Sequence, residues 1–152
     1  MAGLDLTILK IIFGTLLGAV IGAGITIWRT KYTVFSSDFS KRIEDACSLI
    51  DEMAECSSRI WANLDSSDPL KSNKHYVVGL KNRLSTQIHS LDEDYKEMKV
   101  KSVEQAFIEF SRVCTGGDFS SKDVAAEYQI SAIQKNAELL KSSLYKVRHS
   151  KY

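Results

Sequence analysis

The side chains in this sequence that could bind metal or attack a substrate are scattered along the chain. The three histidines and three cysteines are His75, His89, His149, Cys47, Cys56 and Cys114. They show neither the CxxC nor the HExxH spacing that places ligands around one metal ion. No serine lies in a nucleophile elbow, and the glycine pair in residues 115–118 lacks the lysine of a phosphate-binding loop. We therefore expect no metal, no cofactor, no small-molecule ligand and no enzymatic activity.

The overall charge is almost balanced, which argues against a nucleic-acid partner. The 152 residues include 20 Lys or Arg and 19 Asp or Glu, for a formal net charge of +1. Nucleic-acid binders concentrate positive charge on one surface. The acidic run Asp92, Glu93 and Asp94 is typical of a solvated helix face rather than of an acid–base pair. The length allows one compact domain at most.

Residues 11 to 28 carry no charge and predict a membrane anchor. At about 1.5 Å per residue this run forms a helix of roughly 27 Å, close to the thickness of a bilayer core. Lys10 is near enough to the end of the run to reach the interface. The predicted parts are an N-terminal tail 1–5, a transmembrane helix 6–28, a juxtamembrane segment 29–36 and a soluble helical bundle 37–152.

Two other interpretations of the apolar run remain open, a cleaved signal peptide and a buried core helix. Gly24 is small enough to precede a cleavage site. The apolar run nevertheless continues through Trp28 and stops at Arg29, as it does in a retained anchor. We therefore favour an uncleaved single-pass helix in contact with the lipid bilayer.

The distribution of positive charge predicts the orientation of this helix. Basic residues are more numerous after the apolar run than before it, and cytoplasmic flanks of membrane helices carry such an excess. We expect the bundle on the cytoplasmic side, in the inner membrane of a bacterium or as a phage protein placed there. The predicted membrane-interface residues are Lys10, Trp28, Arg29, Lys31 and Tyr32.

Small residues repeat at intervals of four within the apolar run. The predicted association face comprises Gly14, Gly18 and Gly22, with Ala19 and Ala23 alongside. Such a face lets a second helix approach closely in lipid, although glycine is also common in membrane helices that do not associate. The stripe favours self-association, without indicating whether the helices dimerise or enclose a pore.

The rest of the chain predicts an all-α fold, an antiparallel bundle of three to four helices with coiled-coil-like heptad seams. The first seam is Phe39, Ile43, Ala46, Ile50, Met53, Ser57, Ile60 and Leu64. The second is Val77, Leu80, Leu84, Ile88, Leu91, Tyr95 and Met98. Apolar residues at alternating steps of three and four fit helices that pack against neighbours. We expect the first helix to cover 37–65 and to end before Pro69.

A third and a fourth helix follow. The third has its apolar residues at Val103, Ala106, Phe107, Phe110, Val113 and Cys114. The fourth has them at Ile130, Ile133, Ala137, Leu140, Leu144 and Val147. We expect a break between the second and third helices, and a positive backbone angle at the glycine pair Gly116 and Gly117 to end the third. The seam of the fourth helix has polar flanks, so this helix is either peripheral or partly reserved for another chain.

Two features concern contacts between helices. The first bundle helix is acidic and the second is basic, which predicts that they attract each other as antiparallel neighbours. Gly79 in the second helix predicts close packing against a neighbour, because glycine costs about 1 kcal/mol relative to alanine inside a helix. The three cysteines are expected to be small buried side chains in a reducing compartment.

Three functional hypotheses follow from this layout. The first is a non-enzymatic interaction and oligomerisation module, anchored at the cytoplasmic face, whose partner is a helical protein or another copy of itself. The second is a membrane-perturbing effector of the toxin or antiviral-defence type that clusters through its glycine-striped helix. Third, one N-terminal anchor followed by helix is similar in outline to the inner-membrane spanins of phages, and that resemblance implies a periplasmic bundle.

Overall fold

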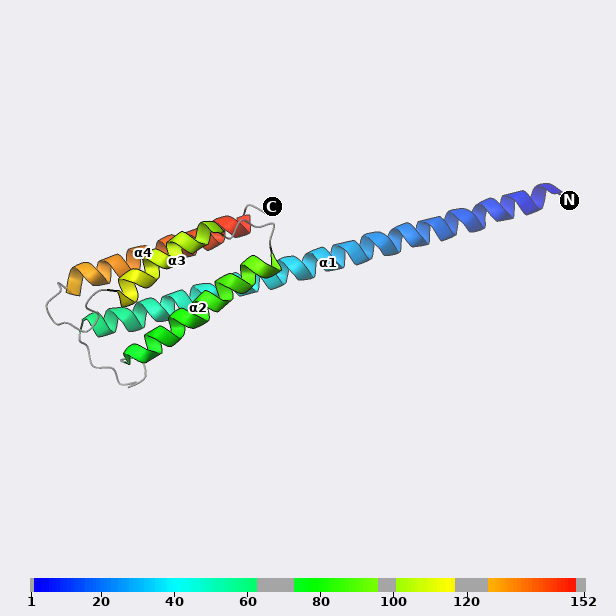
Figure 1. Ribbon diagram of the computed structural model, residues 1–152. Coiled ribbons are helices and arrows are strands. Elements are labelled where there is room, and N and C mark those ends of the chain that lie inside the picture. Colours follow the sequence, from blue (N-terminus) through cyan, green and yellow to red (C-terminus); the bar gives the residue numbers. More distant parts are fainter. Residues whose placement is uncertain (1, 63–72, 96–100, 117–125, 150–152) are drawn as a thin grey trace. The chain divides into compact units, whose positions relative to one another are not determined.

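The computed structural model describes residues 2–62, 73–95, 101–116 and 126–149 (Figure 1). These residues form four α-helices and no strand: α1 (Ala2–Trp61), α2 (Lys74–Asp94), α3 (Lys101–Thr115) and α4 (Ala126–His149). The predicted all-α bundle is therefore confirmed. The chain divides into two compact units, Met1–Asp38 and Phe39–Tyr152.

The helix α1 includes the residues for which we expected a separate juxtamembrane segment. Its bounds are Ala2–Trp61, so Ser36, Ser37 and Asp38 lie inside a helix, and the expected helix start at residue 37 is wrong. No glycine or proline occurs between Gly24 and Pro69, and so no residue in this stretch forces the helix to end. Three polar residues in succession are not enough to break a helix.

The second unit is a bundle in which successive helices alternate in direction (Figure 1). At one end, the Arg42 guanidinium lies 2.7 Å from the Asp94 carboxylate, which joins the start of the bundle part of α1 to the end of α2. At the other end, the Trp61 indole donates a hydrogen bond of 3.4 Å to the Cys114 carbonyl near the end of α3. Consequently α2 is antiparallel to α1, and α3 runs in the same direction as α1.

The helices α1 and α4 pack antiparallel with a regular register. Three polar contacts mark it: Arg148 with Glu44 at 3.5 Å, Lys141 with Asp51 at 2.8 Å, and Gln134 with Ser58 at 3.4 Å. Each step of seven residues forward along α1 is a step of seven residues back along α4. The hydrogen-bonded pair of Cys47 and Tyr145 fits the same register. A heptad repeat in both helices thus fixes their alignment.

The predicted seams form the core. The fully or nearly fully buried apolar residues include Phe39, Ile43, Ile50, Met53, Leu80, Leu84, Ile88, Leu91, Phe110, Ile133, Leu140 and Leu144. Ile60 is half-buried against this core, and Leu64 lies outside the described residues. The three cysteines are buried and none of them forms a disulfide bond. Apolar burial along all four helices is the main term that stabilises such a unit.

The observed helix ends and the surroundings of the glycines agree only in part with the predictions from the sequence. The helices α2 and α3 are separate, and the Asn73 side chain caps α2 by accepting a hydrogen bond of 2.8 Å from the His75 backbone N–H. A Cβ added to Gly79 would meet nothing within 4 Å, so the predicted close packing there is wrong. The φ angle of Gly116 is outside the left-handed range, and Gly117 lies outside the described residues; an added Cβ at Gly116 would collide with the carbonyl oxygen of Arg112.

Among the described residues, the acidic side chains of α1 that pair with a cation on another helix are Glu44 and Asp51, and both cations lie on α4, not on α2 as we expected. The Lys141 ammonium contacts Asp51 at 2.8 Å and Glu138 at 2.6 Å, and its side chain is only 16% exposed. Hydrogen bonds to Asp51 and then to Glu138 raise the pKa of Lys141 above its ordinary value. The net charge of a segment does not reveal which face carries each charge, and the face selects the partner helix.

Candidate functional site

The first unit presents apolar side chains on all sides of its helix. The large hydrophobic residues that are 42 to 70% exposed there are Ile8, Ile11, Ile12, Phe13, Leu16, Leu17, Val20, Ile21, Ile25, Ile27, Trp28, Tyr32, Val34 and Phe35. A water-soluble surface seldom carries an apolar patch of this extent. Among the described residues, α1 is the one helix long and apolar enough to cross a membrane. This surface is the candidate membrane segment.

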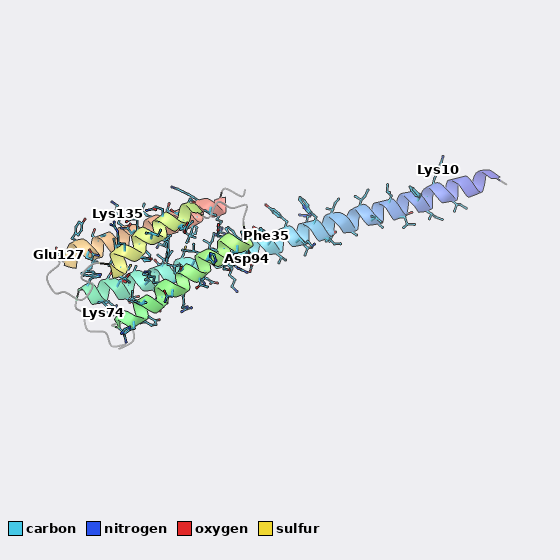
Figure 2. All side chains as sticks on the ribbon, in the orientation of Figure 1. Lys10, Phe35, Lys74, Asp94, Glu127 and Lys135 are labelled. Atoms are coloured by element: carbon cyan, nitrogen blue, oxygen red, sulfur yellow. The ribbon has the colours of Figure 1, made fainter. Side chains whose placement is uncertain are left out.

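Polar and aromatic residues lie at the two ends of the charge-free run 11–28. The predicted interface residues Lys10, Trp28, Arg29, Lys31 and Tyr32 are all exposed (Figure 2 labels Lys10). The rings of Trp28 and Tyr32, one helical turn apart, stack with their centroids 6.2 Å apart. An aromatic pair next to two basic residues suits the boundary between hydrocarbon and headgroups.

Threonines inside this segment satisfy their own hydroxyls, a feature that the sequence analysis missed. The Thr15 hydroxyl donates to the carbonyl of Ile11 one turn back. The hydroxyls of Thr26, Thr30 and Thr33 make the same contact at 2.8 to 2.9 Å. An unsatisfied hydroxyl in hydrocarbon is costly, and Thr15 and Thr26, which lie within the charge-free run, need no partner from water. The sequence could have indicated these hydrogen bonds, because a threonine inside a helix can donate to the carbonyl four residues before it.

The glycine stripe lies open. A Cβ added at Gly14, Gly18 or Gly22 would meet nothing within 4 Å, and Ala19 and Ala23 beside them are exposed. No contact among the described residues therefore requires these positions to be small. Close approach of a second helix is one physical reason for small residues there.

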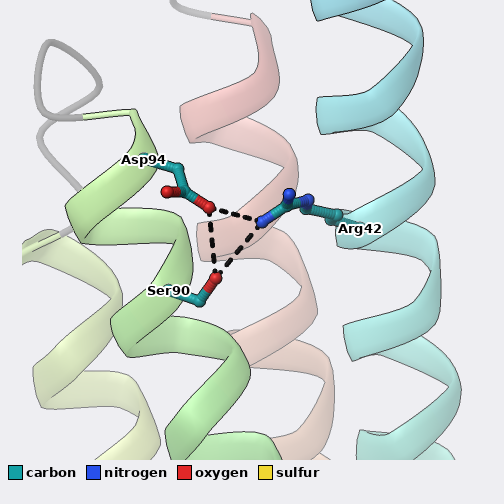
Figure 3. Close-up of polar contacts among 3 residues, drawn as sticks. All are labelled: Arg42, Ser90 and Asp94. Carbon is teal, nitrogen blue, oxygen red and sulfur yellow. Dashed lines mark hydrogen bonds and ion pairs between the residues drawn. The ribbon is translucent and has the colours of Figure 1, made fainter.

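In the bundle, a polar cluster joins α1 to the end of α2 (Figure 3). The Arg42 guanidinium donates to the Asp94 carboxylate at 2.7 Å and to the Ser90 hydroxyl at 3.2 Å. The Arg42 guanidinium also lies 5.7 Å from the centre of the Tyr95 ring, which packs on Phe39 at 4.7 Å. These groups satisfy one another, so the cluster fixes the positions of two helices.

A groove of about 420 Å³ lies between α2 and α3. Its lining residues are Ser85, Ile88, His89, Asp92, Glu104, Phe107 and Ile108. We call it the α2–α3 groove. Among the described residues, neither Asp92 nor Glu104 has an ion-pair partner, whereas His89 lies 3.3 Å from Glu93. The groove could not be predicted from the sequence, because it depends on which two helices are neighbours.

The histidines and cysteines are not brought together. In the part of the chain that the structure describes, no group of three Cys, His, Asp or Glu side chains is placed to hold a metal ion. Burial raises the pKa of Cys114 to about 12, although the Ser57 hydroxyl beside it acts in the opposite direction. A thiol with such a pKa is almost entirely protonated near neutral pH, so it is a poor nucleophile.

These features define a class of architecture: a four-helix bundle whose first helix, α1, also contains a candidate membrane span. Comparisons with protein-family models, with curated proteins and with solved structures give no match. The functional conclusion must therefore rest on the surfaces of the two units.

Proposed function

We propose that this chain is a single-pass membrane protein whose helical bundle is a non-enzymatic module for binding other helices, including those of further copies. The observation that carries this proposal is the candidate membrane segment, where a charge-free run of eighteen residues lies within an exposed apolar surface. Burying that surface in lipid stabilises the protein by about 25 cal/mol for each Å² of apolar surface removed from water.

Two observations support a bundle on the cytoplasmic side. Arg29 and Lys31 directly follow the apolar run, and Lys41 and Arg42 come soon after, whereas Lys10 is the one basic side chain before it. An excess of this kind is typical of the cytoplasmic flank. The three buried cysteines form no disulfide bond, as is usual in a reducing compartment.

The chain is expected to sediment with membranes and to resist extraction at alkaline pH. A fluorescent reporter fused to the C-terminus should be bright and a phosphatase fused there inactive, because phosphatase folds outside the cytoplasm. A chain found in the soluble fraction would contradict the anchor. An active phosphatase would contradict the cytoplasmic side and favour the spanin-like alternative.

A second candidate function, a membrane-perturbing effector, is favoured by the open glycine stripe. If anchors cluster through that stripe, Gly18→Leu should reduce both self-association of the chain in membranes and any ion leakage on overexpression. The added side chain keeps a second helix at a distance, and weakening helix association by about 1 to 2 kcal/mol corresponds to roughly a fivefold to thirtyfold effect.

Val20→Leu is the matched control, because it adds bulk two residues away on a different side of the helix. Leakage measured with a potential-sensitive dye distinguishes the two functions. If the unmodified chain causes no leakage and Gly18→Leu lowers self-association, the interaction module is supported. If the unmodified chain causes leakage that Gly18→Leu does not change, clustering through the stripe is not the cause of the leakage.

A further inference from the structure

The α2–α3 groove combines an apolar floor with negative charge at one end. Ile88, Phe107 and Ile108 form the floor, and Ile108 is 50% exposed. Asp92 is close to the end of α2, and Glu104 is close to the start of α3. The two helices run in opposite directions (Figure 1), so the end of α2 and the start of α3 lie at the same end of the groove, and so do Asp92 and Glu104. An occupant needs an apolar side chain next to a positive one.

A surface with this chemistry occurs on α4 of the same chain. Tyr128, Lys135, Leu139 and Lys146 follow one another at intervals of seven, four and seven residues, and all four are exposed. At about 100° per residue these positions fall within roughly 40° of one line along the helix. We call them the α4 stripe. Tyr128 is 74% exposed and Leu139 is 52% exposed, on a helix whose opposite side faces the core.

The charges of the two surfaces are complementary and unused. Among the described residues, neither Lys135 nor Lys146 has an ion-pair partner (Figure 2 labels Lys135). The same holds for Asp92 and Glu104 across the groove. A lysine lies on each side of Leu139, so either direction of a docked α4 brings one lysine to the acidic end of the groove.

We propose that the α4 stripe of one copy docks into the α2–α3 groove of a second copy, with Leu139 on the apolar floor and a lysine against the two carboxylates. The contact uses different surfaces on the two copies, so it is heterologous: the copy that docks its stripe keeps a free groove, and the copy that receives it keeps a free stripe. Further copies can therefore be added. This inference rests on the proposed function, because it names the bundle's partner as another copy.

The test uses two differently tagged full-length copies in the same membranes, one with Ile108→Cys and the other with Leu139→Cys. Both positions are half-exposed, so the fold tolerates the changes. Mild oxidation should produce a disulfide-linked dimer carrying both tags. Copies without an introduced cysteine should give none, since their native cysteines are buried.

Charge reversal then tests the complementarity. Lys135→Glu with Lys146→Glu in the Leu139→Cys copy should lower the yield of linked dimer at least about fivefold. Asp92→Lys with Glu104→Lys in the Ile108→Cys copy should restore it. Exchanging the exposed pair Lys41 and Asp45, as Lys41→Glu with Asp45→Lys, is the matched control and should change nothing.

Three results would overturn the inference: links between two Ile108→Cys copies as strong as the mixed links, no effect of charge reversal, or a different protein linked at the groove instead. The cross-linking test and the test of the proposed membrane anchor can fail independently. Mixed links in a chain found in the soluble fraction would contradict the proposed anchor and support the docking. A membrane-bound chain without links would support the anchor and contradict the docking.

Discussion

Replacing Phe110 with alanine is expected to lower the free energy of unfolding of the bundle by about 3 to 5 kcal/mol. Phe110 is fully buried and is the largest core side chain of α3, so its removal leaves a cavity that the surrounding helices fill only in part. A domain of this size is stable by about 5 to 15 kcal/mol, and the loss is therefore a large share of the total. Urea unfolding of the full chain in detergent, followed by circular dichroism, measures it.

Tyr128→Ala is the matched control for this variant. It removes an aromatic ring of similar size from α4, but Tyr128 is 74% exposed, and surface changes of this kind stay within about 0.5 kcal/mol. Equal losses for the two variants would show that Phe110 does not pack in the core as described.

The Cys114 thiol is expected to react about 1000-fold more slowly with maleimide in the folded chain than a thiol of ordinary pKa. Burial raises its pKa from 9.0 to about 12, and the thiolate, which is the reacting form, becomes rarer in the same proportion. The rate should still rise with pH above about pH 10, where a thiol of pKa 9.0 is already mostly thiolate and its rate levels off.

Mass spectrometry of labelled peptides follows Cys114 separately from Cys47 and Cys56. The same chain unfolded in urea supplies the reference rate, and Ser131→Cys supplies an exposed thiol on the folded chain. Labelling of Cys114 at the rate of Ser131→Cys would mean that the space around Cys114 is open to solvent.

The sequence was sufficient to predict which residues are buried. Ile43, Leu84 and Leu140 were assigned to the core from their periodicity, and all three are almost fully buried. Periodicity predicts burial because a helix turns its side chains at a constant angle, so a repeat of three and four marks one face. The separation of α2 from α3 was likewise predictable, from the lengths of the helices.

Contacts between helices were not predictable in this way. Lys141 was assigned to no partner, yet it joins α1 to α4 through Asp51. The α2–α3 groove and the role of Gly116 also depend on residues distant in sequence or on local backbone approach. Charge, spacing and propensity describe one helix at a time, whereas neighbours and register depend on how all the faces fit together.

The heptad register between α1 and α4 limits how this protein can change in length. Deleting one residue from the middle of α4 would rotate the rest of that helix by about 100° and shift it by about 1.5 Å, so the pairs beyond the deletion could no longer meet. Deleting seven residues from each of α1 and α4 would keep the remaining contacts, including that of Arg148 with Glu44, in phase. Related chains are therefore expected to differ in these helices by whole heptads, with matching changes in both.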